Sequence, residues 1–255
     1  MIVEKRDPTL KYPPAIKDEK TRLVLDWLLE FRFSSVEILS KRIGQTPMNS
    51  NRFFNSLKKD GVLQEFKNVH TKNQRYLIMT SVGVSYLEAL GRDISKAVTR
   101  VSNLGKYSHI IHDLSVQFAI VTRLHNYCEV IADKNIQFGE KGDRPDAILA
   151  TEKDGRKYWS AIEFERWRKD NKRIYLTFKN HANNFANKEY TGVIYIFQQE
   201  ADCKHYEKLF NESMWPTFSR TPKSGQLRKL SNDFNPDEIP KLRDRYVFQY
   251  DPISF

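Results

Sequence analysis

Cysteine is scarce in this sequence: 255 residues contain only Cys128 and Cys203. Two cysteines are too few for a disulfide framework, and their separation does not match that of a cysteine metal site, which favours a reducing compartment. The sequence also lacks an apolar run long enough to cross a bilayer, and its first residues lack the apolar centre of a secretory signal. We therefore expect a cytoplasmic protein with no membrane insertion.

Positive charge is in excess. The chain has 42 Lys and Arg against 32 Asp and Glu, a formal net charge of +10 at pH 7. Such a balance favours polyanionic partners, of which nucleic acid and an anionic membrane surface are the common ones. The 40% hydrophobic content argues against disorder and allows one large core or two small ones.

The first 95 residues show the pattern of short helices followed by a hairpin. Apolar residues recur at helical spacing over 18–33, 36–44 and 49–61, with Gly44 and Gly61 as stop signals. Two β-like runs follow, 62–69 and 74–80, joined by a polar turn. Thr80 and Ser81 then cap a fourth helix over 82–90. Three helices and a hairpin in this order predict a winged helix-turn-helix domain.

The third helix of this domain is the expected DNA reader. Polar and basic side chains suited to base edges and phosphates lie on its exposed side or on the wing. The expected DNA-binding residues are Asn49, Asn51, Arg52, Asn55 and Lys58 on the helix, with Lys67, Lys72 and Arg75 on the wing. Two other interpretations stay open: these residues are only a solvated face, or the winged helix is a protein-binding module.

A polar stretch over 92–105 predicts a joint, so we expect a winged-helix domain at 1–95 and a second domain at 96–255. The second domain reads as a helix over 107–127, three strands within 128–166, a helix over 169–190 and a buried strand over 191–197. This order predicts an α/β (α+β) core with a central mixed sheet flanked by helices. The basic stretch 217–230 suits a flexible loop that clamps DNA backbone, or a disordered surface segment.

Three carboxylates gather around the expected second and third strands. Asp146 opens the second strand, and Glu163 and Glu165 lie two residues apart on the third, so their side chains share one face. Both glutamates flank Phe164 in an otherwise apolar strand, where a carboxylate is costly without a partner. Mg²⁺ is held by such oxygen ligands. The sequence therefore predicts a divalent-cation site. The simpler interpretation is that the three acids face water and are neighbours by coincidence.

Short motifs around these acids resemble a known superfamily. "RPDA" at 144–147 and "IEFE" at 162–165 resemble the PD-(D/E)XK nucleases, whose signature is Pro-Asp on one strand and Glu-x-Lys on the next. Together with "HDLSVQF" at 112–118, "AIEFERWRKDNKR" and a preceding winged helix, they resemble MOBC-type plasmid mobilisation relaxases and the related replication-relaxation proteins. The resemblance is close over residues 107–175.

The resemblance implies a Mg²⁺- or Mn²⁺-dependent DNA endonuclease, a hydrolase that nicks one strand at a plasmid transfer origin to start conjugative mobilisation. Its partners would be double-stranded and nicked plasmid DNA at that origin, with accessory mobilisation and coupling proteins. The catalytic and metal residues would be Asp146, Glu163 and Glu165. Glu165 replaces the superfamily lysine, whose role Lys169 or Lys172 would take.

The helix of the first motif would add side chains to the site. His112, Asp113 and Gln117 would approach the carboxylates, and of the adjacent His112 and Asp113 at most one faces the metal, with His112 preferred. The nucleophile is either water or, if a covalent DNA intermediate forms, a tyrosine. Tyr175 and Tyr190 are the candidate tyrosines, and the simpler interpretation of both is that they are core or surface aromatics.

Two other functions remain open. The first is a non-catalytic plasmid DNA-binding regulator of replication or transcription with a degenerate nuclease fold, as the absent superfamily lysine suggests. The second is a restriction-type nuclease that cuts both strands. Retention of all three acids favours an enzyme.

Overall fold

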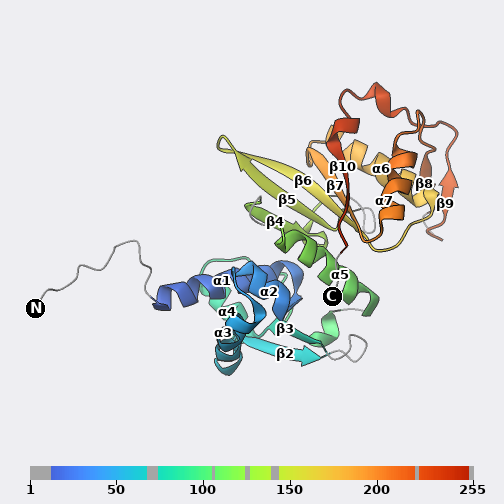
Figure 1. Ribbon diagram of the computed structural model, residues 1–255. Helices are drawn as coiled ribbons and strands as arrows, with labels where there is room; N and C mark the ends of the chain where they lie inside the picture. The colour runs from blue at the N-terminus through green and yellow to red at the C-terminus, as the bar shows by residue number, and fades with distance from the viewer. Residues whose placement is uncertain are drawn as a thin grey trace, which may run out of the picture. The chain divides into compact units, whose positions relative to one another are not determined.

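The computed structural model describes residues 13–67, 74–104, 107–123, 127–138, 144–221 and 224–252 (Figure 1). The chain divides into two compact units, Met1–Gln117 and Phe118–Phe255. The division falls inside helix α5 (Tyr107–Val121), beyond the joint expected at residue 95. Two side chains explain the later division, because Asp113 and Gln117 of α5 both bond to residues of the first unit.

The first unit consists of short helices around a three-stranded antiparallel sheet of order β1-β3-β2. Its elements are α1 (Pro13–Phe31), β1 (Phe33–Ser35), α2 (Val36–Arg42), α3 (Pro47–Lys59), β2 (Leu63–Lys67), β3 (Arg75–Met79) and α4 (Ser81–Ala89). The helices and the hairpin lie close to their expected ranges. Strand β1 was not expected, since three residues are too few to show a periodic pattern.

Hydroxyl caps fix the starts of the helices in the first unit. The side chain of Ser35 accepts from the Ile38 backbone N–H, and that of Thr80 accepts from the Gly83 backbone N–H, as expected for the fourth helix. Helix α3 begins earlier than expected, because Thr46 caps it and Pro47 occupies its first turn, where a missing N–H costs nothing. Gly44 and Gly61 end their helices in the left-handed region, with φ of 67° and 70°.

The second unit contains a mixed five-stranded sheet of order β10-β7-β6-β5-β4. Strands β4, β5 and β6 run antiparallel, and β7 and β10 run parallel to β6. Its elements are β4 (Glu129–Ala132), β5 (Ala147–Lys153), β6 (Arg156–Glu165), α6 (Asn171–Ala186), β7 (Gly192–Phe197), α7 (Glu200–Phe210), β8 (Phe218–Arg220), β9 (Leu227–Lys229) and β10 (Tyr246–Tyr250). Short 3₁₀ turns complete the two units: η2 (Val101–Asn103), η4 (Asp133–Asn135), η5 (Pro236–Glu238) and η6 (Arg243–Arg245).

The mixed α/β class with a mixed sheet is as expected. Asp154 and Gly155 form the β5–β6 turn with positive φ, 52° and 70°, the backbone that a two-residue hairpin needs. Within the basic stretch expected to be a flexible or disordered loop, β8 pairs antiparallel with β9. Helix α7 and the edge position of β10 were not expected from the pattern of residues.

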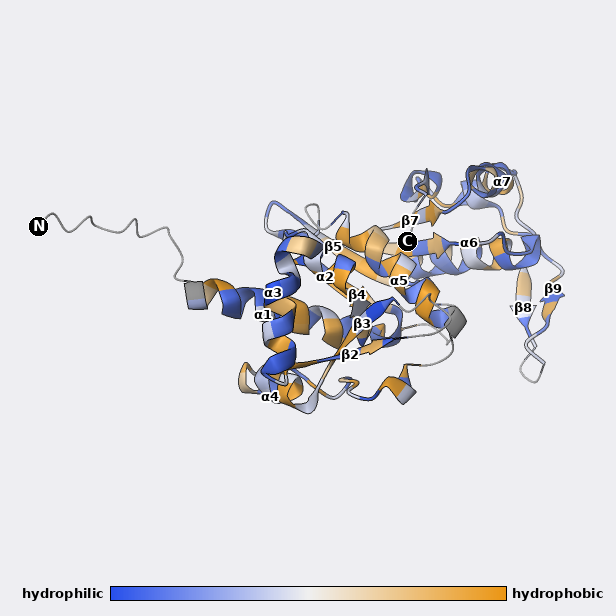
Figure 2. Cartoon of the chain, turned by 60° about the horizontal axis from the view of Figure 1, so that its bottom comes forward, coloured by the Kyte–Doolittle hydropathy of each residue, from blue (hydrophilic) through white to orange (hydrophobic). Residues whose placement is uncertain are grey.

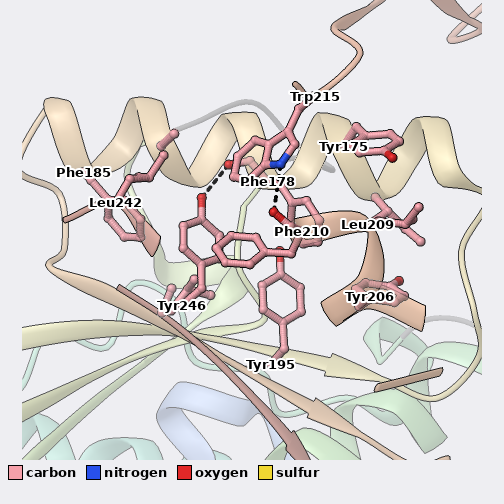
Figure 3. Close-up of a cluster of buried hydrophobic side chains, with 14 of the residues drawn as sticks. Tyr175, Phe178, Phe185, Tyr195, Tyr206, Leu209, Phe210, Trp215, Leu242 and Tyr246 are labelled. Atoms are coloured by element: carbon pink, nitrogen blue, oxygen red, sulfur yellow. Dashed lines mark hydrogen bonds between the residues drawn. The ribbon is translucent and has the colours of Figure 1, made fainter. Parts of the chain in front are cut away.

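Aromatic side chains form the core of the second unit (Figure 3). Phe178 of α6 lies at its centre, with its ring 5.3–6.1 Å from those of Tyr195, Tyr206, Phe210, Trp215 and Tyr246. Tyr246 Oη donates to Phe178 O at 2.6 Å and Trp215 Nε1 donates to Phe210 O at 3.1 Å, so these two buried polar groups are paired.

Helix α6 carries both polar and apolar residues (Figure 2), and its apolar side supplies Ile174, Phe178 and Phe185 to this core. In the part of the chain that the structure describes, no helix combines the length and apolar content needed to span a bilayer.

Candidate active site

Asp146 is fixed against β6 by its own backbone and side chain. It immediately precedes β5, and the antiparallel register pairs Ala147 with Ile162, which brings Asp146 beside Glu163. Its backbone N–H donates to Ile162 O at 3.0 Å, and its Oδ2 accepts from the Phe164 N–H at 2.7 Å. One expected site residue therefore meets the strand that carries the other two.

Glu163 and Glu165 point into the interior of the second unit. Parallel pairing places them beside Tyr195 and Phe197 of β7, and cross-strand neighbours project from the same face of a sheet. Tyr195 and Phe197 belong to the aromatic core, so the carboxylates share its face. The glutamates are only 6% and 3% exposed. Charges buried to this degree require partners.

Lys169 is the cationic partner of both glutamates. Its Nζ lies 2.6 Å from Glu165 Oε1 and 3.9 Å from Glu163 Oε2, while its side chain keeps 30% exposure. Burial lowers the pKa of Lys169, but the attraction of Glu165 and Glu163 outweighs burial and raises that pKa well above its ordinary value. Lys169 is therefore charged at any physiological pH.

Glu165 titrates in the neutral range. Burial raises the pKa of its carboxyl group to about 7, and the charges of Glu163 and Asp146 add to the rise, while Lys169 opposes it. At neutral pH the carboxyl is therefore partly protonated. A group poised in this way is typical of sites that bind cations or move protons, although buried structural pairs show such shifts too.

His181 joins the site from α6 and is 3% exposed. Its Nε2 lies 3.2 Å from Glu163 Oε1, a distance that suits an ion pair, but the angles do not make a hydrogen bond. Its Nδ1 contacts Tyr190 Oη, which also accepts from Asn184 Nδ2 at 2.8 Å. Since Asn184 donates to Tyr190, the tyrosine hydroxyl can donate to Nδ1, and the His181 proton then sits on Nε2, toward Glu163.

Three buried polar atoms near the carboxylates lack hydrogen-bond partners among the described residues, namely His181 Nε2, Tyr195 Oη and Tyr206 Oη. Burial and the nearby charge of Glu163 raise the pKa of Tyr195 well above its ordinary value. An unpaired polar atom in a core costs about 1–3 kcal/mol, so native proteins seldom leave one without a ligand or a water.

The carboxylate oxygens of this site are chemically suitable ligands for a hard cation. Asp146, Glu163 and Glu165 supply carboxylate oxygens, the ligands that Mg²⁺ and Mn²⁺ prefer. As the side chains stand, no group of three His, Cys, Asp or Glu residues in the described ranges is gathered closely enough to hold a metal ion. Lys169 instead supplies the positive charge beside Glu165 and Glu163.

The expected contribution of α5 is partly wrong. Asp113 pairs with Arg32 at 3.2 Å, and Gln117 is fully buried, with bonds to Trp27 Nε1 and Phe33 O at 3.0 Å each. Gln117 therefore serves the core of the first unit, and Asp113 forms an ion pair within that unit. His112 lies on the same part of α5, in the first unit, whereas the carboxylates belong to the second.

The expected reader helix presents most of its polar residues to solvent. Asn49, Asn51, Arg52 and Asn55 are exposed on α3. Lys58 is half-buried and pairs with Glu65 of β2 at 2.6 Å.

On the wing, Arg75 also contacts Glu65, at 3.6 Å, but is 61% exposed. Lys67 is exposed at the end of β2, and Lys72 lies outside the described residues.

The two candidate tyrosine nucleophiles are core residues. Tyr175 is 6% exposed and donates to Glu212, and Tyr190 is 2% exposed and contacts His181. Burial raises the pKa of each phenol above its ordinary value. Neither phenol is therefore prepared to attack a phosphate.

His181 is the site residue that the sequence interpretation missed. A signal for it exists: Ile174, Phe178, His181 and Phe185 follow one helical stripe, so the only polar member of that stripe must face the core. The signal shows burial, while the partner Glu163 emerges only from the fold.

No protein-family model, no curated protein and no solved structure matches this chain.

Proposed function

We propose that this chain is a divalent-metal-dependent DNA endonuclease of the relaxase kind, which nicks one strand at a plasmid transfer origin to start conjugative mobilisation. The observation that carries the proposal is the set of Asp146, Glu163 and Glu165 around a buried edge of the core, with Lys169 beside them. Carboxylates so placed are costly to folding, which is the usual signature of a functional site.

The order of elements supports the same class. Helix α5 is followed by β4, β5, β6, α6 and β7, with Asp146 next to the second of these strands and Glu163 on the third. The PD-(D/E)XK resemblance places its acids on two successive strands in this way. The one departure is Glu165, and Lys169 is the lysine that contacts this position.

The first unit supports recognition of duplex DNA. We propose that its succession α1, β1, α2, α3, β2, β3 forms a winged helix-turn-helix, with α3 as the second helix of the turn. Exposed amide and guanidinium groups on α3, from Asn51, Arg52 and Asn55, are suited to base edges in a major groove.

The residues of the second unit can share the work of phosphodiester cleavage. Asp146, Glu163 and Glu165 would hold Mg²⁺ or Mn²⁺, which supplies charge neutralisation at the scissile phosphate and activation of water. Lys169 can release Glu165 and place its ammonium on a phosphate oxygen, where positive charge stabilises the transition state. His181 holds Glu163 from the helix side. Water is the nucleophile we propose, because Tyr175 and Tyr190 are buried.

Relaxation of supercoiled plasmid tests the proposal. Purified protein with Mg²⁺ or Mn²⁺ is incubated with plasmids that contain or lack a transfer origin, in parallel with Asp146→Ala and Glu163→Gln. We expect open circles from origin plasmids only, and none with either variant. Linear plasmid as the product would contradict the relaxase proposal and indicate a nuclease that cuts both strands.

A second candidate is a non-catalytic DNA-binding regulator of replication or transcription. The observation in its favour is that Lys169 already neutralises Glu165, so the acids are satisfied without a cation. Under this alternative the protein binds DNA but cleaves none with any metal, and Mn²⁺ leaves its thermal unfolding unchanged.

A further inference from the structure

An exposed tryptophan stands directly after the carboxylate strand. Trp167 is 67% exposed, whereas Trp27 and Trp215 are 3% and 0% exposed and Trp159 is half-buried. It lies two residues beyond Glu165 and two before Lys169. The guanidinium of Arg166 lies 5.8 Å from the centre of its ring, which leaves the other ring face open for a planar ligand.

The segment 166–173 is the most basic part of the second unit that adjoins the acids. Its sequence, RWRKDNKR, contains Asp170 as its single acid. Arg168 pairs with Asp202 and Lys169 with Glu165. The side chains of Lys172 and Arg173 have no carboxylate partner among the described residues and are exposed. Unpaired cations of this kind are available to an anionic ligand.

A pocket opens beside these cations. It has a volume of about 820 Å³ and lies between the first turn of α6 and the β8–β9 hairpin. Its lining residues are Asp170, Asn171, Lys172, Arg173, Arg220, Gly225, Gln226 and Leu227. Asp170 is already engaged, since its side chain accepts from the Arg173 backbone N–H. The three cations therefore give the pocket a positive lining, with amide groups beside them.

We propose that Trp167 and this pocket together bind single-stranded DNA, with one base stacked on Trp167 and the neighbouring phosphates held by Lys172, Arg173 and Arg220. The inference rests on the proposed function for the identity of the nucleic acid as DNA. Asp170 lies three positions after Trp167, a span of at most about 11 Å of chain, so adjacent nucleotides can reach both. Stacking platforms and cationic tracks in combination are the usual means of binding single strands.

Stacking on a side chain selects single strands over duplex. Every base within a duplex already has neighbours on both faces, so Trp167 can only stack on a base that is unpaired or turned out. For a nicking enzyme, this places the unpaired strand beside the carboxylates and gives strand choice a physical origin.

The test is oligonucleotide binding in EDTA, where no cleavage occurs. A dye-labelled 12-nucleotide single strand and the matching duplex are titrated with the full chain, and anisotropy and tryptophan quenching are recorded. Trp167→Ala should weaken single-strand binding by about five- to hundredfold, the usual loss of one stacked base, and abolish most of the quenching, while Trp167→Phe retains most of the affinity. Lys172→Gln with Arg173→Gln should lower the salt slope of single-strand binding by about 1.4. Lys204→Gln with Lys208→Gln on α7 is the charge-matched control and should lower it less.

Unchanged single-strand affinity in Trp167→Ala would overturn the inference, as would equal losses for duplex and single strand. Failure of the proposed function has a different signature. A chain that binds single strands through Trp167 yet never nicks with Mg²⁺ or Mn²⁺ keeps the inference and loses the endonuclease. A chain that nicks at an origin but binds single strands equally well without Trp167 keeps the endonuclease proposal and loses the inference about Trp167.

Discussion

At the scale of single residues, the chemistry of the second unit is concentrated in Glu165 and Lys169. A carboxyl that is 3% exposed prefers its neutral form, and an ammonium at 2.6 Å prefers that carboxyl charged. Burial is the stronger influence, because the pKa of Glu165 rises to about 7. The protonation state of this one group therefore changes within the physiological range.

Stability should fall as pH rises because of Glu165. The folded state binds its proton more tightly than the unfolded state, whose pKa is near 4.5, so the contribution is fully present below about pH 4.5 and lost by about pH 7. The loss amounts to about 3 kcal/mol at most. Urea unfolding of wild type and Glu165→Gln between pH 4.5 and 8 measures it as a difference. A constant difference between the two proteins across this range would contradict the pKa.

Removal of the Lys169 charge should make the second unit dependent on a cation. Lys169→Met leaves Glu163 and Glu165 without their ammonium, which should destabilise the protein by about 1–3 kcal/mol. Under the proposed function, Mn²⁺ should then raise the thermal midpoint of the variant more than that of wild type.

The control for this change is Lys204→Met, whose partner Glu200 is exposed, and which should cost less than about 0.5 kcal/mol. Equal Mn²⁺ responses in Lys169→Met and wild type would count against metal binding by these carboxylates.

At the scale of elements, α3 is the test of DNA reading. Arg52→Ala and Asn55→Ala remove exposed groups from α3, so they should weaken binding to duplexes that wild type enriches from a random pool, by about fivefold or more each. Mn²⁺ affinity should stay unchanged. Arg22→Ala on the exposed side of α1 removes the same charge elsewhere and is the matched control. Equal losses of duplex affinity in all three variants would mean that α3 does not read the DNA sequence and that binding depends only on general electrostatics.

Helix α4 depends on a glycine for its close approach to the sheet. A Cβ at Gly83 would lie 2.7 Å from both Val62 O and the Met79 side chain, and the backbone atom cannot yield easily. Gly83→Ala should therefore destabilise the first unit by about 1–3 kcal/mol despite the better helix propensity of alanine. Thermal unfolding should show no comparable loss for Ser85→Ala, an exposed position on the same helix.

Elements with a strong local signal were predictable from the sequence. The helices of the first unit, the β5–β6 hairpin with its Asp154-Gly155 turn, and the placement of both glutamates on one strand all follow from periodicity and turn chemistry. Strand β1 is too short for a pattern, and β10 gains its place only through pairing with β7. Non-local pairing leaves no trace in a local window.

The candidate site divides in the same way. Four site residues could be predicted from the sequence because they lie in two short motifs: Asp146, Glu163, Glu165 and Lys169. Glu165 and Lys169 also have the i,i+4 spacing of an ion pair. His181 comes from a different element, and its approach to Glu163 depends on how α6 crosses the sheet. Gln117 was misjudged because its partners, Trp27 and Phe33, lie far away in the sequence.

At the scale of the whole molecule, the two units should fail independently. Under the proposed function, Glu163→Gln should abolish nicking and leave duplex selection intact, whereas Arg52→Ala should retain nicking but lose preference for the origin. Both proteins are assayed for cleavage on mixed plasmids and for binding by anisotropy. If Glu163→Gln also lost duplex selection, the division of labour between the units would be wrong.

Strand β10 has a consequence for synthesis of the protein. It pairs with β7 at the edge of the sheet, and its Tyr246 enters the aromatic core, so it covers a strand made some fifty residues earlier. On the ribosome, the first unit can fold as soon as α5 emerges, while β7 waits with an open edge. Under the proposed function, a nascent chain would thus be able to bind DNA through its first unit before its carboxylates are enclosed, and cleavage competence would follow.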